Sequence, residues 1–177
     1  MPTNVSSGRA RLARLLPALV AALLAQPAQA DGWVAFEATW SAAGRRQVVG
    51  AGDREAVTTH LSGALTVLRG EGLRKGYRGE ALFYSDGRDV GVGTLVLTDD
   101  RGDQVFCDLA GEAAAGGALV RGTIRGGTGA YSEISGDLSF RWRHLVKTPE
   151  GDVQGVAEDF KGRYRRTARA PGAEAPR

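Results

Sequence analysis

The heptapeptide DLSFRWR, at residues 137–143, alternates between polar and apolar side chains without a break. Leu138, Phe140 and Trp142 fall on one face of an extended chain, and an aspartate, a serine and two arginines fall on the other. Successive side chains of a β-strand point to opposite faces of its sheet, whereas an apolar stripe on a helix recurs every three or four residues. The heptapeptide therefore predicts a β-strand that buries one face and exposes the other.

Seven other segments of similar length are rich in β-branched, aromatic and leucine residues, and breaks rich in Gly and Asp separate them. The breaks SDGR at 85–88, DDRGD at 99–103 and TPEGD at 148–152 have the composition of tight turns. Connections this short favour antiparallel hairpins over crossovers through helices. Residues 42–59 carry the weakest pattern and are expected to form a loop or a short helix. The eight predicted strands lie at residues 33–41, 60–68, 77–84, 90–97, 104–111, 118–125, 137–146 and 153–165.

Strands of this kind can pack as a sandwich of two sheets or close into a barrel, and closure removes the exposed edges of a sheet. Glycines inside the predicted strands, such as Gly63, Gly93 and Gly122, favour closure because they permit the sharp coiling of a small barrel. The outward faces carry Arg, Lys, Asp and Glu, which a lipid-facing band does not accept, so the barrel is not expected to be membrane-embedded. The predicted fold is an all-β, eight-stranded antiparallel closed β-barrel, a single domain at 31–166.

The most distinctive loop is GGTGAYSEISG, at residues 126–136, which joins two predicted strands. Its glycines can adopt positive φ angles, and its threonine can hydrogen-bond to neighbouring backbone. Tyr131 and Ile134 are expected to cover one end of the barrel as a single turn. A phosphate cradle is the alternative for a Gly-rich loop, but no lysine follows this one and no helix opens from it. The residues assigned to this structural loop are Gly126, Gly127, Thr128, Gly129 and Tyr131.

The same loop, with RGTI at 121–124 before it and DLSF at 137–140 after it, resembles a loop of the allene oxide cyclase and dirigent protein superfamily. The resemblance is sharp over residues 118–142 and loose over the rest of 33–165, and it is greatest to uncharacterised secreted bacterial members. It implies an eight-stranded antiparallel barrel with an apolar interior. It also implies a cyclase or dirigent activity that relies on a few polar residues, including a carboxylate, and the formation of homo-oligomers.

Residues 1–30 have the three parts of a secretory signal peptide in the expected order. Three arginines and no acidic residue precede an apolar stretch at 15–25, and an AQA motif ends at Ala30, directly before Asp31. We therefore expect cleavage at that point and a periplasmic or secreted mature protein, with a buried core helix as the alternative. The tail at 167–177 has no apolar period and is expected to be disordered.

The charge balance excludes one class of partner. The whole chain has 23 Lys and Arg against 20 Asp and Glu, and the leader holds three of the basic residues and none of the acidic ones. The mature chain therefore has 20 of each and no net charge. Binding to nucleic acid needs a concentrated positive field, so no nucleic-acid partner is expected. The apolar fraction of 42% and the charged fraction of 24% are typical of a globular protein.

Cysteine and histidine provide little chemistry. The single Cys107 cannot form an internal disulfide, and it is expected to be buried in phase with Leu109 while Asp108 points outward. His60 and His144 lie at the ends of predicted strands, without carboxylates at a matching spacing. No metal site and no cofactor are therefore expected.

Polar groups on apolar faces are the candidates for chemistry, and Glu158 is the strongest of them. Counting by two from Phe160 places its carboxylate on the inward face, with Val156 and Tyr164. A buried carboxylate must be paired, hydrogen-bonded or protonated, and burial raises its pKa. Glu158 is therefore a candidate catalytic acid or base, or a polar anchor for a ligand. The alternative is a bulge in this strand that leaves Glu158 in solvent.

These observations predict an exported barrel that binds a small apolar or amphipathic molecule in its interior, without a defined reaction. Two alternatives stay open. One is a cyclase or isomerase of the allene oxide cyclase type that acts through Glu158. The other is a filled barrel that serves as an interaction or structural module, because side chains nearly fill the interior of an eight-stranded barrel. The residues expected to contact the ligand are Leu65, Phe83, Leu138, Phe140, Trp142, Phe160 and Tyr164.

Overall fold

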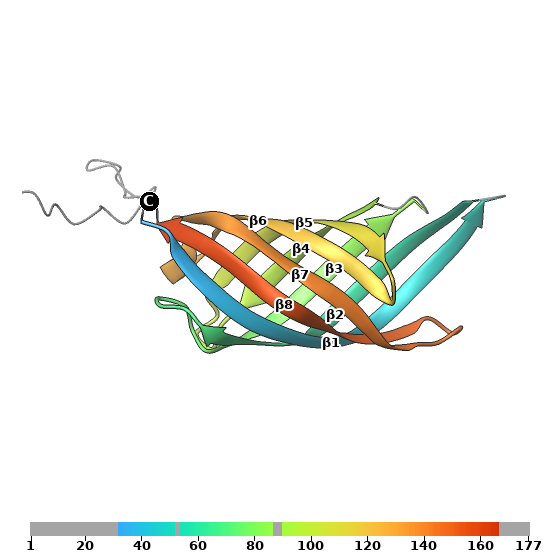
Figure 1. Cartoon of the computed structure of the whole chain (residues 1–177), viewed down its shortest axis with the longest axis horizontal. Helices are drawn as coiled ribbons and strands as arrows, with labels where there is room; N and C mark the ends of the chain where they lie inside the picture. Colours follow the sequence, from blue (N-terminus) through green and yellow to red (C-terminus); the bar gives the residue numbers. More distant parts are fainter. Residues whose placement is uncertain (1–31, 52–53, 87–89, 167–177) are drawn as a thin grey trace, which may run out of the picture. The chain divides into compact units, whose positions relative to one another are not determined.

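The computed structural model describes residues 32–51, 54–86 and 90–166, which form a closed barrel of eight antiparallel strands (Figure 1). Each strand pairs with its neighbours in sequence, and the last strand closes the circle on the first. The predicted all-β closed barrel is confirmed, and the sandwich of two sheets is excluded. The predicted leader and tail lie outside the described residues. The strands are β1 (Val34–Ala51), β2 (Arg54–Arg69), β3 (Gly76–Ser85), β4 (Val90–Thr98), β5 (Gln104–Ala114), β6 (Gly117–Gly127), β7 (Ile134–Lys147) and β8 (Asp152–Arg166).

The hairpin of β1 and β2 is longer than the sequence indicated. The expectation of a loop or short helix at 42–59 is wrong, because the described part of this segment continues both strands, which pair as far as Ala51 with Arg54. β1 leaves β8 after Arg45, and pairing of β2 with β3 begins only at Val57. The end of the hairpin therefore projects past the rim of the barrel as a two-stranded arm (Figure 1). Side chains on such an arm meet solvent on both faces, so the sequence there has no need to alternate.

Aromatic rings fill the middle of the barrel. Phe140 stacks on Phe160 with ring centroids 4.9 Å apart and planes 7° from parallel, and Trp40 meets Phe140 edge to face at 6.3 Å. Phe160 also lies 6.3 Å from Phe36, further along the barrel. We call Trp40, Phe140 and Phe160 the aromatic layer; each is at most 4% exposed. The layer divides the interior into two halves that are packed very differently.

Two glycines of β8 make room for the rings. A Cβ atom at Gly162 would lie 2.4 Å from Cζ of Phe36, and one at Gly155 would lie 2.4 Å from Cζ2 of Trp142. Neither distance can accommodate a side chain, so these rings rest against bare backbone. Interior glycines thus have a packing role in this barrel in addition to permitting the chain to coil.

Cys107 behaves as the sequence predicted. It is 1% exposed and points inward between Val105 and Leu109, whereas Asp108 points outward and accepts a hydrogen bond from Nε of Arg125 at 2.6 Å. Burial, with a smaller contribution from the charge of Asp108, raises the pKa of Cys107 to about 12. The thiol is therefore neutral near pH 7 and acts as a small apolar side chain.

The loop between β6 and β7 covers one end of the barrel with a single 3-10 turn, η1 (Gly129–Tyr131). Tyr131 and Ile134 are 1% and 3% exposed, so the predicted cover is confirmed. Two reciprocal hydrogen bonds hold the turn on β5. The N–H of Gln104 donates to Oγ1 of Thr128, and the N–H of Thr128 donates to the carbonyl oxygen of Gln104, both at 2.9 Å.

The glycines of this loop have different tasks. Gly126 and Gly129 have positive φ angles, of 132° and 50°, whereas Gly127 does not. Gly127 is needed because the backbone of β5 lies too close for a side chain. A Cβ there would lie 1.9 Å from a backbone carbonyl oxygen of β5. The N–H of Ala130 donates to Oδ2 of Asp103 at 3.0 Å. A carboxylate of the protein thus already binds a donor of the loop, which argues against a phosphate cradle.

A buried carboxylate, Asp99, lies beneath the turn and is 7% exposed. The hydroxyl of Tyr131 donates to Oδ2 at 3.0 Å, and the N–H groups of Arg101 and Asp103 donate to Oδ1 at 2.8 and 3.0 Å. Tyr131 has one hydroxyl proton and gives it to Asp99, so in the 2.8 Å contact between the two hydroxyls Tyr77 is the donor. The chain of hydrogen bonds ties the cap to β3 and to the β4–β5 turn.

The surroundings of Asp99 favour its ionised form. Burial alone would raise its pKa, but the hydrogen bonds from two backbone N–H groups and from Tyr131, with the charge of Arg74 at 3.9 Å, outweigh burial, and the pKa lies below its usual value. Burial raises the pKa of Tyr131 most, and the hydrogen bond to Asp99 and the charge of Asp99 raise it further, so its hydroxyl keeps the proton that it donates.

We expect Asp99→Asn to lower the free energy of unfolding at pH 7 by about 2 kcal/mol, because an amide is uncharged and accepts through only one atom. A carboxylate with a depressed pKa stabilises the fold above its unfolded pKa, near 3.9, and this stability is lost as the pH falls through the folded value. The difference between the two proteins should therefore shrink below about pH 4. Urea unfolding followed by tryptophan fluorescence from pH 7 to 3 measures it.

The matched control is Asp100→Asn, whose side chain is 73% exposed and which should leave both the stability and its acid dependence close to those of the wild type. Equal stability of the Asp99→Asn protein and the wild type at pH 7 would contradict this account of the cap.

Candidate functional site

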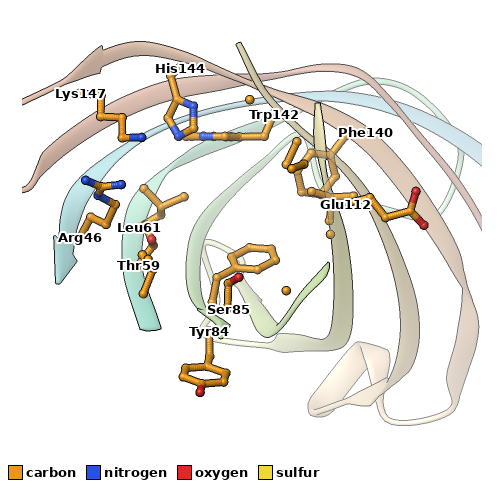
Figure 2. A pocket seen from close by; sticks show the side chains of 18 of the residues that line it. Arg46, Thr59, Leu61, Tyr84, Ser85, Glu112, Phe140, Trp142, His144 and Lys147 are labelled. Carbon is orange, nitrogen blue, oxygen red and sulfur yellow. The ribbon is translucent and has the colours of Figure 1, made fainter. Parts of the chain in front are cut away.

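The half of the barrel away from the cap contains a cavity of about 340 Å³. The capped half contains a void of only about 20 Å³, so side chains fill it almost completely. The cavity opens at the rim where the hairpins β1–β2, β3–β4, β5–β6 and β7–β8 turn (Figure 2). Its apolar wall is formed by Trp40, Leu61, Phe83, Val120, Phe140 and Trp142.

Small residues explain why this half is open. Most of the residues that β4, β5 and β6 contribute to the cavity near the rim are small, namely Gly91, Gly111, Gly117 and two alanines, where the capped half has large side chains. A closed circle of eight strands has a fixed width, so replacing large inward side chains with small ones leaves space. A Cβ atom at Gly111 would have only ordinary contacts, the nearest at 3.7 Å to Val120, so this glycine borders the empty space.

The mouth of the cavity is polar on one side. Arg46 enters it from the arm, opposite Thr59 of β2, and His144 and Lys147 enter it from β7. Figure 2 shows these three basic side chains gathered on the same side of the cavity, beside Trp142. The carboxylate of Glu112 and the ring of Tyr84 point away from the cavity (Figure 2).

His144 is held in its neutral form. Burial lowers its pKa most, and the charges of Lys147 and Arg46 lower it further. A hydrogen bond with the backbone of Gly116 raises the pKa but does not outweigh these effects. The ring lies edge to face with Trp142 at 6.2 Å. A neutral imidazole at the mouth can donate one hydrogen bond and accept another, and its pKa will respond to any charge that enters.

The structure separates the predicted ligand-contacting residues into three groups. Phe83, Phe140 and Trp142 line the open cavity. Leu65, Leu138 and Tyr164 border only the small void of the capped half, where no ligand fits. Phe160 is packed into the aromatic layer and is 1% exposed. The expectation of an apolar interior is therefore correct, but only one half of the barrel is open.

The expectation that Glu158 faces the interior is wrong. Its Oε1 accepts a hydrogen bond from Nε of Arg143 at 2.5 Å, and its side chain is 40% exposed on the outer wall. Asp159 has a φ angle of 52°, and the register of β8 with both neighbouring strands shifts here, which defines a bulge. The bulge lets Ala157 and Phe160 both point inward and turns Val156 and Glu158 outward. The alternative of a solvated Glu158 is the one observed.

The basic residues of the mouth were not recognised in the sequence as a site. Counting by two from Trp142 leads to His144, and counting by two from Trp40 leads to Arg46. The first signal was available, but the second lay in a segment expected to be a loop. Lys147 could not be placed by counting, because the register between β7 and β8 shifts again after His144.

The chain matches no protein-family model, and no similar protein was found among curated proteins or solved structures. In the described part of the chain no helix is long and apolar enough to cross a membrane. Residues 32–51, 54–86 and 90–166 contain no group of three or more His, Cys, Asp or Glu side chains that could hold a metal ion.

We expect Glu158→Gln to change the free energy of unfolding by less than about 1 kcal/mol, because an exposed ion pair contributes little. A double-mutant cycle with Arg143→Gln, measured by urea unfolding, isolates the energy of the pair. A loss of several kcal/mol in the single variant, or an unfolding curve that titrates near neutral pH, would contradict an outward carboxylate.

Proposed function

We propose that the protein is an exported barrel that binds one small apolar or amphipathic molecule in the open half of its interior. The observation that carries this proposal is a cavity of about 340 Å³, walled by aromatic and aliphatic side chains, in a barrel whose other half is packed. Binding sites for small molecules are typically concave and mostly apolar, with volumes of about 300–1,000 Å³. The cavity lies at the lower end of this range, which limits it to a single small ligand.

Desolvation supplies the affinity in this proposal. Each square ångström of apolar surface removed from water contributes about 25 cal/mol. Trp40, Phe83, Phe140 and Trp142 offer ring faces and edges to a ligand, and such pairs prefer offset or edge-to-face contacts. Trp40 and Phe140 belong to the aromatic layer and are already packed against other rings. Ordering these two rings around a ligand therefore costs little entropy.

The outer wall is consistent with a barrel that is surrounded by water. Ion pairs join Asp108 with Arg125, Glu158 with Arg143, and Asp137 with Arg163 across neighbouring outward positions. A lipid-facing band cannot accept such a surface at low cost.

Export to the periplasm or the medium is proposed from the predicted leader. Membership of the allene oxide cyclase and dirigent superfamily is proposed from the cap loop and the closed eight-stranded barrel.

The other two functions have less support. A cyclase or isomerase acting through Glu158 requires a carboxylate in the lumen, but Glu158 lies on the outer wall. Glu112, the one acidic residue among the described residues that border the cavity, is exposed and pairs with Arg121 at 3.9 Å. A filled barrel describes the capped half but not the half with the cavity.

The neutral fluorescent probe N-phenyl-1-naphthylamine tests the proposal, because its emission rises in an apolar site. We expect saturable binding of one molecule per barrel, and Gly111→Leu should weaken it by about tenfold or more, since the new side chain occupies the cavity.

The matched control is Ala110→Leu, one residue away on the outer face of β5, which should leave the affinity unchanged. Absence of saturable probe binding, or equal loss in both variants, would overturn the proposal.

A further inference from the structure

The mouth of the cavity carries positive charge that the described residues do not neutralise. Arg46 and Lys147 are basic side chains, and neither makes an ion pair with any residue that the structure describes. The acidic side chains nearby are engaged elsewhere. Asp152 pairs with Arg45 at 3.3 Å on the outside of the barrel, and Glu112 is turned away from the cavity (Figure 2).

Arg46 is the best placed of these groups to receive a ligand atom. Its backbone is fixed, because its N–H donates to the carbonyl oxygen of Gly151 at 2.7 Å and it pairs with Thr59 in the β1–β2 ladder. Its Nε atom is buried, with no hydrogen-bond partner in the described part of the chain. A buried N–H of a charged group that lacks an acceptor costs free energy, so an acceptor brought by a ligand would remove an existing penalty.

The geometry points to an aromatic monoanion, such as an aromatic carboxylate, whose rings occupy the cavity and whose anionic group binds Arg46, with His144 and Lys147 beside it. This inference rests on the proposed function and adds the chemical class of the ligand. The ring faces of the wall favour a planar apolar body, and a guanidinium matches the two oxygens of a carboxylate. The imidazole of His144 adds a polar ring beside the same group.

The partial burial of the mouth strengthens the preference for an anion. Charges in partly desolvated surroundings interact more strongly than exposed ones, and salt screens them less. The pKa of His144 is lowered by burial and by the charges of Lys147 and Arg46, so a bound carboxylate would offset two of the three causes. A neutral ligand of the same shape would leave the cations without a counter-charge.

Two probes of nearly the same shape, 2-naphthoate and 2-naphthamide, separate this inference from the proposed function. Each is titrated against the wild type by calorimetry and by displacement of N-phenyl-1-naphthylamine. We expect naphthoate to bind about tenfold more tightly than naphthamide. Arg46→Gln should abolish that preference, because naphthoate loses much more affinity than naphthamide, and saturable binding of the neutral fluorescent probe should persist.

The control variant is Arg45→Gln, which removes an adjacent arginine that points outward to Asp152 and should keep the full preference. Lys147→Gln, at an exposed position, should reduce the preference for naphthoate by a smaller factor. If Arg46→Gln does not fold, Lys147→Gln provides the test of the basic mouth in its place.

If the fluorescent probe binds but naphthoate and naphthamide bind equally to the wild type, the anion inference fails and the proposed function stands. A preference that survives Arg46→Gln, or that falls equally in Arg45→Gln, also overturns the assignment of the site. If none of the three probes binds, the proposed function fails and the inference fails with it.

Discussion

Closure of β8 onto β1 is the constraint on which the rest of the structure depends. Eight strands joined in a circle set the width of the interior, so every inward side chain either fills that width or leaves space. The aromatic layer fills it in the middle, and the cap with Tyr131 and Asp99 seals one end. Near the opposite rim the inward positions of three strands hold glycine and alanine, and there the same width becomes a cavity.

A single irregularity in β8 decides which residues face that interior. Pairing shifts register at the level of Asp159 on both sides, between Ala38 and Trp40 in β1 and between Ser139 and Arg141 in β7. The extra residue reverses the alternation of faces along β8, and it moves one carboxylate from the expected lumen to the outer wall. A one-residue change in phase therefore decides whether the carboxylate of Glu158 lies in the interior or on the outer wall.

The sequence was sufficient for the parts of the fold that follow regular physical patterns. The alternation around Phe140, the turn composition between strands and the Gly-rich loop predicted the closed barrel and its cap, because packing and turn geometry act locally there. The bulge at Asp159 was not predictable by counting, since a bulge arises from pairing with two neighbouring strands. Arg46, at the base of the arm, was missed because the weak alternation of the arm beyond it led to the prediction of a loop. The division into a packed and an open half depends on volumes summed across the barrel, which no single strand reveals.

The central claim is that one half of the interior is packed and the other is open to a small molecule. A crystal structure of the protein soaked with iodobenzene tests it directly, because the anomalous signal of iodine locates an apolar probe in a cavity. We expect one strong peak between Phe83, Phe140 and Trp142, and none among Leu65, Leu138 and Tyr164. Iodine found only on the outer wall, or side chains from β5 and β6 filling the space beneath the rim, would contradict it.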